Sequence, residues 1–303
     1  MAPIQRAWVI LFALTLARTA MGFQFQSVAA VGPLLTAEAT ISYAALGTLM
    51  GFYLLPGAFF ALPGGWLGRR FGDKRVVLAG LAMMTGGGAL LALSGIYEVM
   101  LAGRLIAGIG AVLLNVLLTK MVTDWFAGQR IVTAMAFLIS SWPLGIAIAL
   151  MTLGPLGKSI GLEAAFALPV AVSAVALVMV ASLYQPPPGI EEAAGNTPGR
   201  ILGSLSRREL WGSLLAGAVW CFINVAFILP LSFGPEFLTA RGMELAAAGA
   251  VTSLASWLII PALPLGGWLA ERIERPDAIM AASFLAIAGL LWAIPFLPAP
   301  RRR

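Results

Sequence analysis

The chain has 303 residues, of which 60% are hydrophobic and 11% are charged, and its mean hydropathy is +0.94. Soluble domains carry about 25% charged residues, so this composition excludes an ordinary soluble protein. The net charge of +6 would suggest nucleic-acid binding in a soluble protein, but here the basic residues follow membrane topology, and no nucleic-acid partner is expected. With one cysteine, Cys221, and no histidine, the chain offers neither an internal disulfide nor a predicted metal site.

Apolar runs follow one another along the chain, each long enough to cross a hydrocarbon core of about 30 Å as a helix. The first run is too long for a cleaved signal peptide and lacks a small-x-small cleavage site. We predict nine transmembrane helices in an all-α integral membrane fold. They lie at roughly 7–33, 42–67, 75–95, 98–121, 131–153, 163–184, 210–234, 245–270 and 277–297.

The only polar stretch of any length runs from Tyr184 to Ser206 and is rich in proline and glycine. It separates six predicted helices from three. We therefore expect an N-terminal six-helix bundle over residues 1–184, a cytoplasmic linker over 185–208, and a partial C-terminal bundle of three helices over 209–303.

The chain repeats itself at a constant offset of 202 residues. Gly32-Pro33 recurs as Gly234-Pro235, and Gly64-Gly65-Trp66-Leu67 recurs as Gly266-Gly267-Trp268-Leu269. Such a repeat between long apolar runs indicates a transporter built from two related halves. The second copy stops at Arg303, the equivalent of Leu101, so we expect the chain to be a truncated form of a longer parent.

The loop charges predict the orientation. With the N-terminus in the cytoplasm, twelve Lys and Arg residues lie on the cytoplasmic side and five on the other, three of them at 301–303. The positive-inside rule therefore favours a cytoplasmic N-terminus. Many Arg and three Lys are typical of a GC-rich bacterial genome, and we expect a multi-pass protein of the bacterial inner membrane.

The segment after the second apolar run carries a family pattern. Its sequence is Gly64-Gly65-Trp66-Leu67-Gly68-Arg69-Arg70-Phe71-Gly72-Asp73-Lys74-Arg75. It closely resembles the signature loop of the major facilitator superfamily, which joins the second and third helices. The resemblance implies a hinge role in conformational switching for these residues of the two copies: Gly65, Arg70, Gly72, Lys74, Arg75, Gly267 and Arg272.

One position departs from the family pattern. Arg69 stands where the family usually has Asp, and an acid appears only at Asp73; the second copy has Glu271 at the equivalent place. In the family that Asp helps to latch the two halves together, so the resemblance does not extend to this latch.

Two further stretches are similar to the family. Arg104-Leu-Ile-Ala-Gly108-Ile-Gly110 resembles its fourth-helix pattern, and Asp124-Trp125-Phe126 resembles its junction between helices four and five. The fifth-helix stretch from Ser140 to Gly145 is most similar to the cyanate, nitroimidazole and nitrate porter branches. The resemblance implies a major-facilitator-type bundle with nine helices, six plus three, instead of twelve. It also implies secondary transport rather than enzymatic activity.

All 13 acidic residues are predicted to lie in loops or at helix ends. Proton-coupled carriers generally need a titratable group within the membrane to bind and release the proton. We therefore expect no such group in this chain.

Arg18 is the opposite case, because it lies about 16 Å into the first predicted helix. An unpaired cation at that depth costs about 3 kcal/mol. Arg18, Gly22 and Gln26 recur every four residues and share one helical stripe. The repeat maps Arg18 and Gly22 onto Trp220 and Asn224, so both stripes are expected to face one cavity, with an anionic ligand as counter-ion. The alternative is that Arg18 caps backbone carbonyls or bonds a neighbouring helix.

Other polar and aromatic residues are weaker candidates. Arg104 and Asn115 are eleven residues apart and share a face of the fourth predicted helix, where transport and structural roles are equally open. Trp142 precedes Pro143, a predicted kink where freed backbone groups can face a cavity.

The sequence therefore predicts a transporter of a small anionic solute that works by alternating access. Arg18 would contact the anion, Gln26, Asn115 and Asn224 would donate hydrogen bonds, and Trp142 and Trp220 would wall the cavity. No cofactor is expected, and the partners are the lipid bilayer and the solute. One alternative is a multidrug exporter of the same superfamily. The other is a non-transporting membrane subunit or inactive fragment, whose partial bundle would be covered by self-association or a partner subunit.

Overall fold

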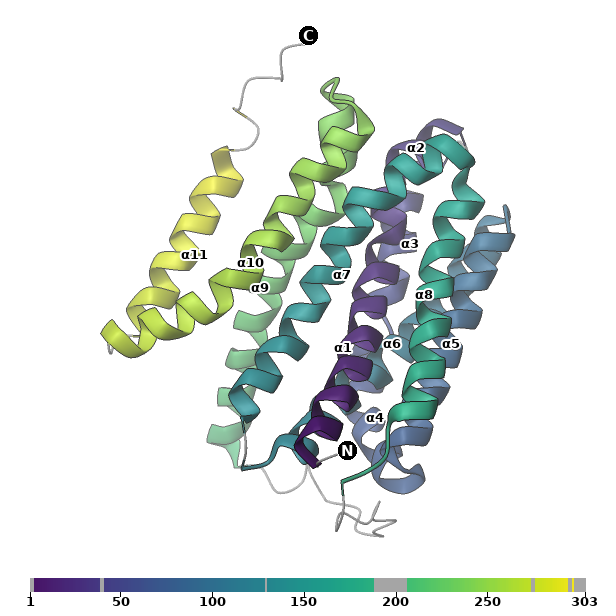
Figure 1. Ribbon diagram of the computed structural model, residues 1–303. Helices are drawn as coiled ribbons and strands as arrows, with labels where there is room; N and C mark the ends of the chain where they lie inside the picture. The colour runs from purple at the N-terminus through teal and green to yellow at the C-terminus, as the bar shows by residue number, and fades with distance from the viewer. Residues whose placement is uncertain are drawn as a thin grey trace.

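The computed structural model describes residues 3–38, 41–128, 130–187, 206–273, 276–293 and 296. The regular structure of these ranges consists of helices, labelled α1 to α11 in Figure 1. Eight of the described segments are long and apolar enough to cross a membrane, and a shorter apolar helix, α11 (Pro276–Ala293), follows them. The prediction of an all-α membrane fold is confirmed.

Proline interrupts the first two membrane-crossing segments. The first consists of α1 (Pro3–Ala30) and α2 (Gly32–Glu38), separated by a turn at Val31. The second consists of α3 (Tyr43–Leu54) and α4 (Gly57–Phe71), separated at Leu55-Pro56. A proline has no N–H for the carbonyl four residues earlier, so each interruption frees backbone groups within a continuous apolar run. The helices predicted at 7–33 and 42–67 are therefore two helices each.

The core lies among α1 to α8. Four long helices join α1 and α3 there: α5 (Asp73–Leu93), α6 (Tyr97–Phe126), α7 (Ile131–Ile160) and α8 (Leu162–Leu183). Glycines allow the closest approaches. A Cβ on Gly87 or Gly103 would lie 2.4 or 2.5 Å from the other residue's carbonyl oxygen, so α5 and α6 are in direct backbone contact. Small residues at such crossings are how helices pack closely in lipid.

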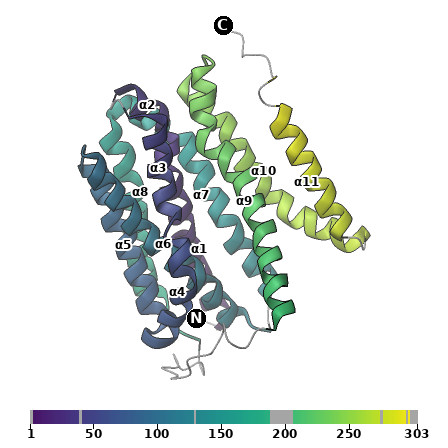
Figure 2. The same ribbon diagram turned by 180° about the vertical axis from the view of Figure 1, so that it is seen from behind.

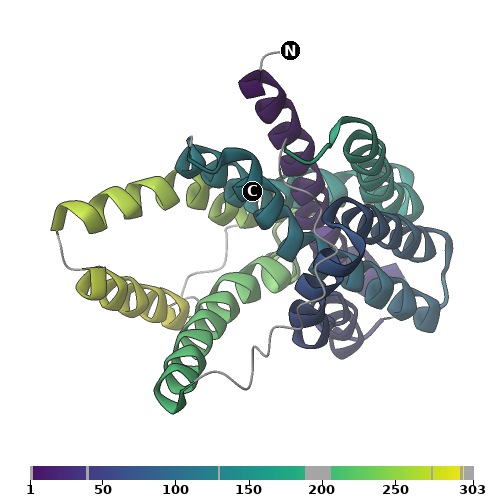
Figure 3. The ribbon, with the colours of Figure 1, turned by 90° about the horizontal axis from the view of Figure 1, so that it is seen from below.

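Two long helices of the second copy stand beside this core. They are α9 (Arg207–Ala240) and α10 (Leu245–Ile273), with α11 outside them (Figure 1). Residues 207–222 of α9 are exposed throughout, whereas Leu231 and Pro235, near its other end, are buried. Seen from behind and from below, the first half of α9 stands apart from α4 (Figures 2 and 3).

α10 packs along α7 near the same end of the molecule. A Cβ on Gly249 would lie 2.2 Å from the carbonyl oxygen of Leu150, and Lys158 pairs with Glu244 at 3.4 Å. The second copy therefore contacts the first at the end of the molecule away from the N-terminus. We call that end the outer end. The two copies diverge towards the end that carries the N-terminus (Figure 1).

Candidate solute-binding site

Arg18 lies in the middle of α1 and has no hydrogen-bond or ion-pair partner among the described residues. Its side chain is half-buried and its Nε is fully buried. A buried donor without an acceptor carries the whole desolvation cost of that group. Arg18 is thus a cation within a membrane helix, and the described part of the chain supplies it with no counter-ion.

The rest of the Arg18 stripe makes contacts between helices. A Cβ on Gly22 would lie 2.4 Å from the carbonyl oxygen of Trp142, so Gly22 marks the crossing of α1 and α7 and does not line an open space. Gln26 is fully buried and donates from Nε2 to the carbonyl oxygen of Leu231 in α9 at 2.5 Å, while its Oε1 is buried without a partner. The expectation of a stripe that faces one cavity along its whole length is therefore wrong at Gly22.

The contact between Gln26 and Leu231 has a local cause in α9. Pro235 lies four residues beyond Leu231 and has no N–H, so the Leu231 carbonyl loses its helical donor. The amide of Gln26 replaces that donor from α1. Neighbouring side chains that satisfy groups freed by proline are the usual way in which membrane helices tolerate it.

A second polar contact closes the outer end. Thr36 of α2 donates from Oγ1 to Oε1 of Glu236 in α9 at 2.9 Å. The predicted helix at 210–234 ended too early, because α9 continues through Pro235 to Ala240. Glu236 therefore lies in the last turns of α9, which agrees with the expectation that the acids lie in loops or at helix ends. We call the contacts Gln26–Leu231 and Thr36–Glu236 the outer closure.

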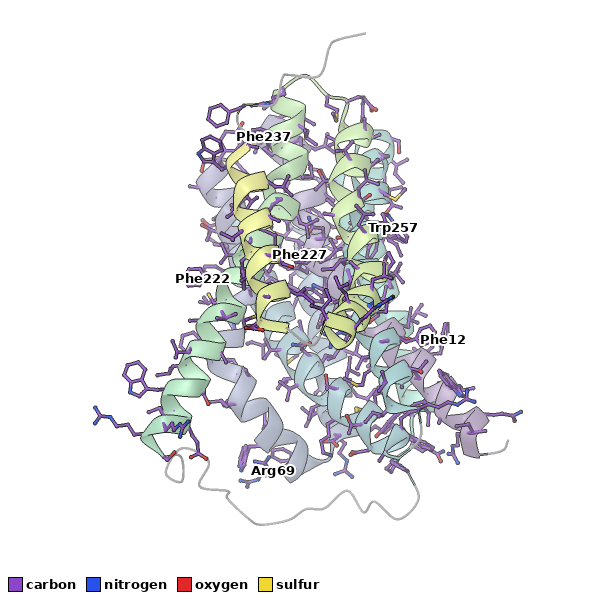
Figure 4. The ribbon with its side chains drawn as sticks, turned by 90° about the vertical axis from the view of Figure 1, so that its left-hand side faces the viewer. Phe12, Arg69, Phe222, Phe227, Phe237 and Trp257 are labelled. Atoms are coloured by element: carbon purple, nitrogen blue, oxygen red, sulfur yellow. The ribbon has the colours of Figure 1, made fainter. Side chains whose placement is uncertain are left out.

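Trp220 and Asn224 lie below the outer closure on α9. Gln26 of α1 contacts Leu231 of α9, and the two helices run in the same direction. Eight residues before these two, Arg18 is therefore level with Ile223, about 12 Å below the closure. The indole of Trp220 is 69% exposed, and Asn224 donates to the carbonyl oxygen of Trp220 at 2.8 Å. Figure 4 labels Phe222 and Phe227 of α9, between which Asn224 lies in the sequence.

Trp142 and Asn115 lie in the first copy. The Trp142 ring stacks on Phe25 with centroids 5.3 Å apart and an interplanar angle of 27°, and it is half-buried. Asn115 is exposed on α6, eleven residues along the helix from Arg104. The structure therefore leaves the polar end of Asn115 accessible, whereas Trp142 is mainly a packing residue.

Arg104 has a full set of protein contacts. Its guanidinium donates to three backbone carbonyls on α1 and α3, those of Leu49, Gln24 and Phe25, at 2.9, 2.9 and 3.0 Å. It also lies over the Tyr53 ring at 4.4 Å and is 1% exposed. These contacts fasten α6 to α1 and α3, which is the structural role considered for Arg104.

The glycine-basic segments are mostly helical. Gly65 and Arg70 lie in α4, and the junction with α5 is the single residue Gly72, whose φ of 87° is a conformation that glycine adopts without strain. Gly267 and Arg272 lie within α10, so the second segment is not a loop up to Ile273. The idea of two equivalent hinge loops is thus corrected to one glycine junction and one helix end.

The basic residues of the first segment have separate roles. Arg70 lies over the ring of Trp66 at 5.1 Å, and Lys74 donates to the carbonyl oxygen of Tyr184 at 2.8 Å, while Arg75 is exposed. Asp73 is buried and pairs with Lys120 of α6. The acid of this segment therefore joins two helices of the first copy and makes no latch to the second.

The sequence-predicted residues are thus divided by the fold. Counted back from the contact between Gln26 and Leu231, Arg18 on α1 and Asn224 on α9 come to about the same level, and Trp220 lies about one turn of α9 further from the outer closure. Gln26 belongs to the closure, and Arg104 and Trp142 belong to the packing of the first copy. Sequence reasoning missed Thr36 and Glu236. The only signal for Glu236 was its position directly after the repeated Gly-Pro pair.

Comparison with known proteins agrees with this architecture. A family model described as Major Facilitator Superfamily matches residues 11–301. The uncharacterized transporter YycB of Bacillus subtilis (strain 168) is 25% identical over 280 residues, which cover 88% of this chain and 66% of YycB. The inner membrane transport protein YajR of Escherichia coli (strain K12) is 30% identical over 167 residues, 55% of this chain and 36% of YajR.

Solved structures share the fold. The crystal structure of a D-xylose-proton symporter superimposes with a TM-score of 0.68 at 17% identity, covering 88% of this chain and 69% of the symporter. The chain spans about a third to two thirds of the length of the two curated relatives named above.

Proposed function

Since the chain belongs to the major facilitator superfamily and is a multi-pass membrane transporter, not an enzyme, we propose that its cargo is a small anionic solute moved by alternating access. The observation that carries the proposal is the unpartnered guanidinium of Arg18 in the middle of α1. An unpaired arginine at the centre of a membrane costs about 3 kcal/mol. An anion bound beside Arg18 would offset this cost and gain charge-assisted hydrogen bonds.

The residues near the level of Arg18 suit a small polar solute. Asn224 and Asn115 carry side-chain amides that both donate and accept hydrogen bonds. The exposed Trp220 gives α9 an aromatic surface about one helical turn below the level of Arg18. Gln26 is reassigned from ligand to closure, since its amide nitrogen is already bonded to Leu231.

The arrangement supports entry from the end that carries the N-terminus. The outer closure holds α1 and α2 against α9, while residues 207–222 of α9 stand exposed. With the N-terminus in the cytoplasm of a bacterial cell, as the loop charges favour, this is an inward-facing state. Residues 1–184 would then rock as one body against α9 and α10, breaking the outer closure in the outward-facing state.

The test is transport in liposomes. The purified chain is reconstituted, and counterflow of a panel of small inorganic and organic anions is measured for the parent, Arg18→Ala and Arg18→Lys. Arg207→Ala is the matched control, because it removes one exposed cation at the start of α9. We expect Arg18→Ala to lose at least about ten-fold in rate, equivalent to about 1.4 kcal/mol, and the control to keep the parental rate. An Arg18→Ala variant that transports the anion at the parental rate would contradict the proposal.

An export function is the second candidate. Trp220 and Phe222 are both exposed on α9, and an aromatic, weakly polar surface suits apolar drugs. A drug exporter would retain transport of hydrophobic cations in the Arg18→Ala variant and would lose it in Trp220→Ala. The same liposomes loaded with a fluorescent cationic dye distinguish the two functions.

A further inference from the structure

Glu236 is the described carboxylate that joins the second copy to the helix break of the first. Thr36 donates to its Oε1 at 2.9 Å, whereas its Oε2 is buried and has no hydrogen-bond partner among the described residues. Oε2 lies 3.4 Å from the position that a Cβ on Gly32 would occupy. Gly32 is the first residue of α2, so the free oxygen rests on the break between α1 and α2.

The break is rich in oxygen acceptors. Pro33 has no N–H, so the carbonyl of Ala29 loses its helical donor. The hydroxyl of Thr36 lies 3.3 Å from the carbonyl oxygen of Pro33 as well as 2.9 Å from Glu236. The carbonyl end of α1 also carries the negative end of its helix dipole. Broken helices in transporters use such freed carbonyls and helix ends to hold Na⁺ or a proton.

No described side chain neutralises Glu236 by an ion pair. The three described ion pairs join other residues, and the nearby Lys158 is taken by Glu244. The Arg241 guanidinium lies over the ring of Phe237 at 4.4 Å.

The other ionisable groups of the helices around Glu236 lie away from it, or their side chains are not among those described. α1 carries Arg6 near its other end and Arg18 in its middle. α9 carries Arg207, Arg208 and Glu209 at its start, and α10 carries Arg272 at its end. α3 contributes Tyr43 and Tyr53, while the side chains of Glu38 and Glu271 are not among those described.

An ionised carboxylate with an oxygen buried and undonated is costly in a low-dielectric interior, and a bound cation removes that cost. Hard monovalent and divalent cations prefer oxygen ligands of this kind. We propose that Glu236, Thr36 and the carbonyls of the α1–α2 break form a site for a small monovalent cation. This site is distinct from the Arg18 site and lies in the outer closure.

The site would make closure depend on the cation. When the outer ends separate, Glu236 meets water and needs no counter-ion. When they close, Oε2 of the carboxylate is buried between α2 and α9, and closure is favoured if the cation is bound there. The proposal rests on the proposed transport function, because it supplies Na⁺ as a coupling cation for the anionic cargo.

The test measures the outer ends without any transport assay. In a Cys221→Ala background, spin labels are attached to Ile96→Cys, between α5 and α6, and to Ala240→Cys, at the end of α9; all three native residues are exposed. Distances between the labels in lipid nanodiscs are recorded in K⁺ at pH 8 and in Na⁺ at pH 8.

We expect the ratio of closed to open distances to be at least about ten-fold higher in Na⁺ than in K⁺. Glu236→Gln should be closed in both buffers, because a neutral amide needs no counter-ion. Glu163→Gln, which removes an exposed acid at the start of α8 and breaks none of the three described ion pairs, should respond as the parent does.

Two results overturn the proposal: a parent chain whose distances are the same in both buffers, or a Glu236→Gln variant that responds like the parent. Thr36→Val provides a second variant that keeps the charge and removes one oxygen, and it should need at least several-fold more cation for closure. An unchanged requirement in Thr36→Val also counts against the site. Arg18→Ala should keep the full cation response, so failure of the anion proposal and failure of this one are separable.

Discussion

The glycine run of α5 tests how closely the helices of the first copy are packed. A Cβ on Gly87 would lie 2.4 Å from the carbonyl oxygen of Gly103 and 2.6 Å from the backbone nitrogen of Ala107. A Cβ on Gly86 would meet nothing within 4 Å. Gly87→Ala and Gly86→Ala are therefore the same chemical change at adjacent residues of one helix, with and without a facing backbone.

The loss of stability expected for Gly87→Ala follows from the overlap of its new methyl group with the backbone of α6. Ordinary van der Waals contact begins at 3.4 Å, so the new methyl group at residue 87 is 1.0 Å too close (3.4 minus 2.4). The obstruction is backbone and cannot rotate away, so α5 and α6 must separate. Overpacking of this kind costs about 1–3 kcal/mol. Gly86→Ala instead gains about 0.5–1 kcal/mol of helix propensity, so the two variants should differ by roughly 1.5–4 kcal/mol.

Thermal unfolding in detergent, followed by tryptophan fluorescence at one fixed scan rate, measures the difference. One kcal/mol shifts the Tm by about 2 °C in a chain of this size, so Gly87→Ala should unfold roughly 3–8 °C below Gly86→Ala. Comparison at one scan rate is needed because membrane proteins often unfold irreversibly. Equal unfolding temperatures for the two variants would refute the close contact of α5 with α6.

Three further variants test other contacts. In Arg104→Lys, the single side-chain nitrogen cannot reach all three backbone carbonyls. Two interhelical hydrogen bonds are lost at about 0.6–1.7 kcal/mol each, so the free energy of unfolding should fall by about 1–3 kcal/mol, measured by the same thermal unfolding assay. Gln26→Leu leaves the Leu231 carbonyl without a donor and should shift the outer-end label distances towards the open state; unchanged distances would contradict the outer closure. Asp73→Asn should lower stability by less than about 1 kcal/mol, because Lys120 is half-exposed, and a larger loss would show that this pair matters more than its exposure indicates.

The sequence predicted the helices for a reason specific to membranes. A chain that crosses lipid must satisfy its backbone polar groups internally, so an apolar run of about 20 residues has few alternatives to a helix. The apolar runs therefore predicted the spanning segments, with α11 as the shorter one. The Gly64–Arg75 segment predicted the family, which the match over residues 11–301 confirms.

The repeated Gly-Pro pair shows what the local sequence alone does not determine. Gly32-Pro33 follows a break between α1 and α2, whereas Gly234-Pro235 lies inside α9. Proline removes one donor in both places, so the local sequence is equivalent. In α9 the freed carbonyl of Leu231 is bonded by Gln26, a residue 205 positions earlier in the chain.

The two arginines within the membrane helices show the same limit of the local sequence. From the sequence, Arg18 and Arg104 were both cations within apolar helices. The fold brings three carbonyls of α1 and α3 to Arg104 and no described acceptor to Arg18. Hydrophobicity and period act along the chain and fix where the helices lie. Whether a buried polar group is satisfied depends on atoms from helices distant in sequence, and only the tertiary structure brings those atoms together.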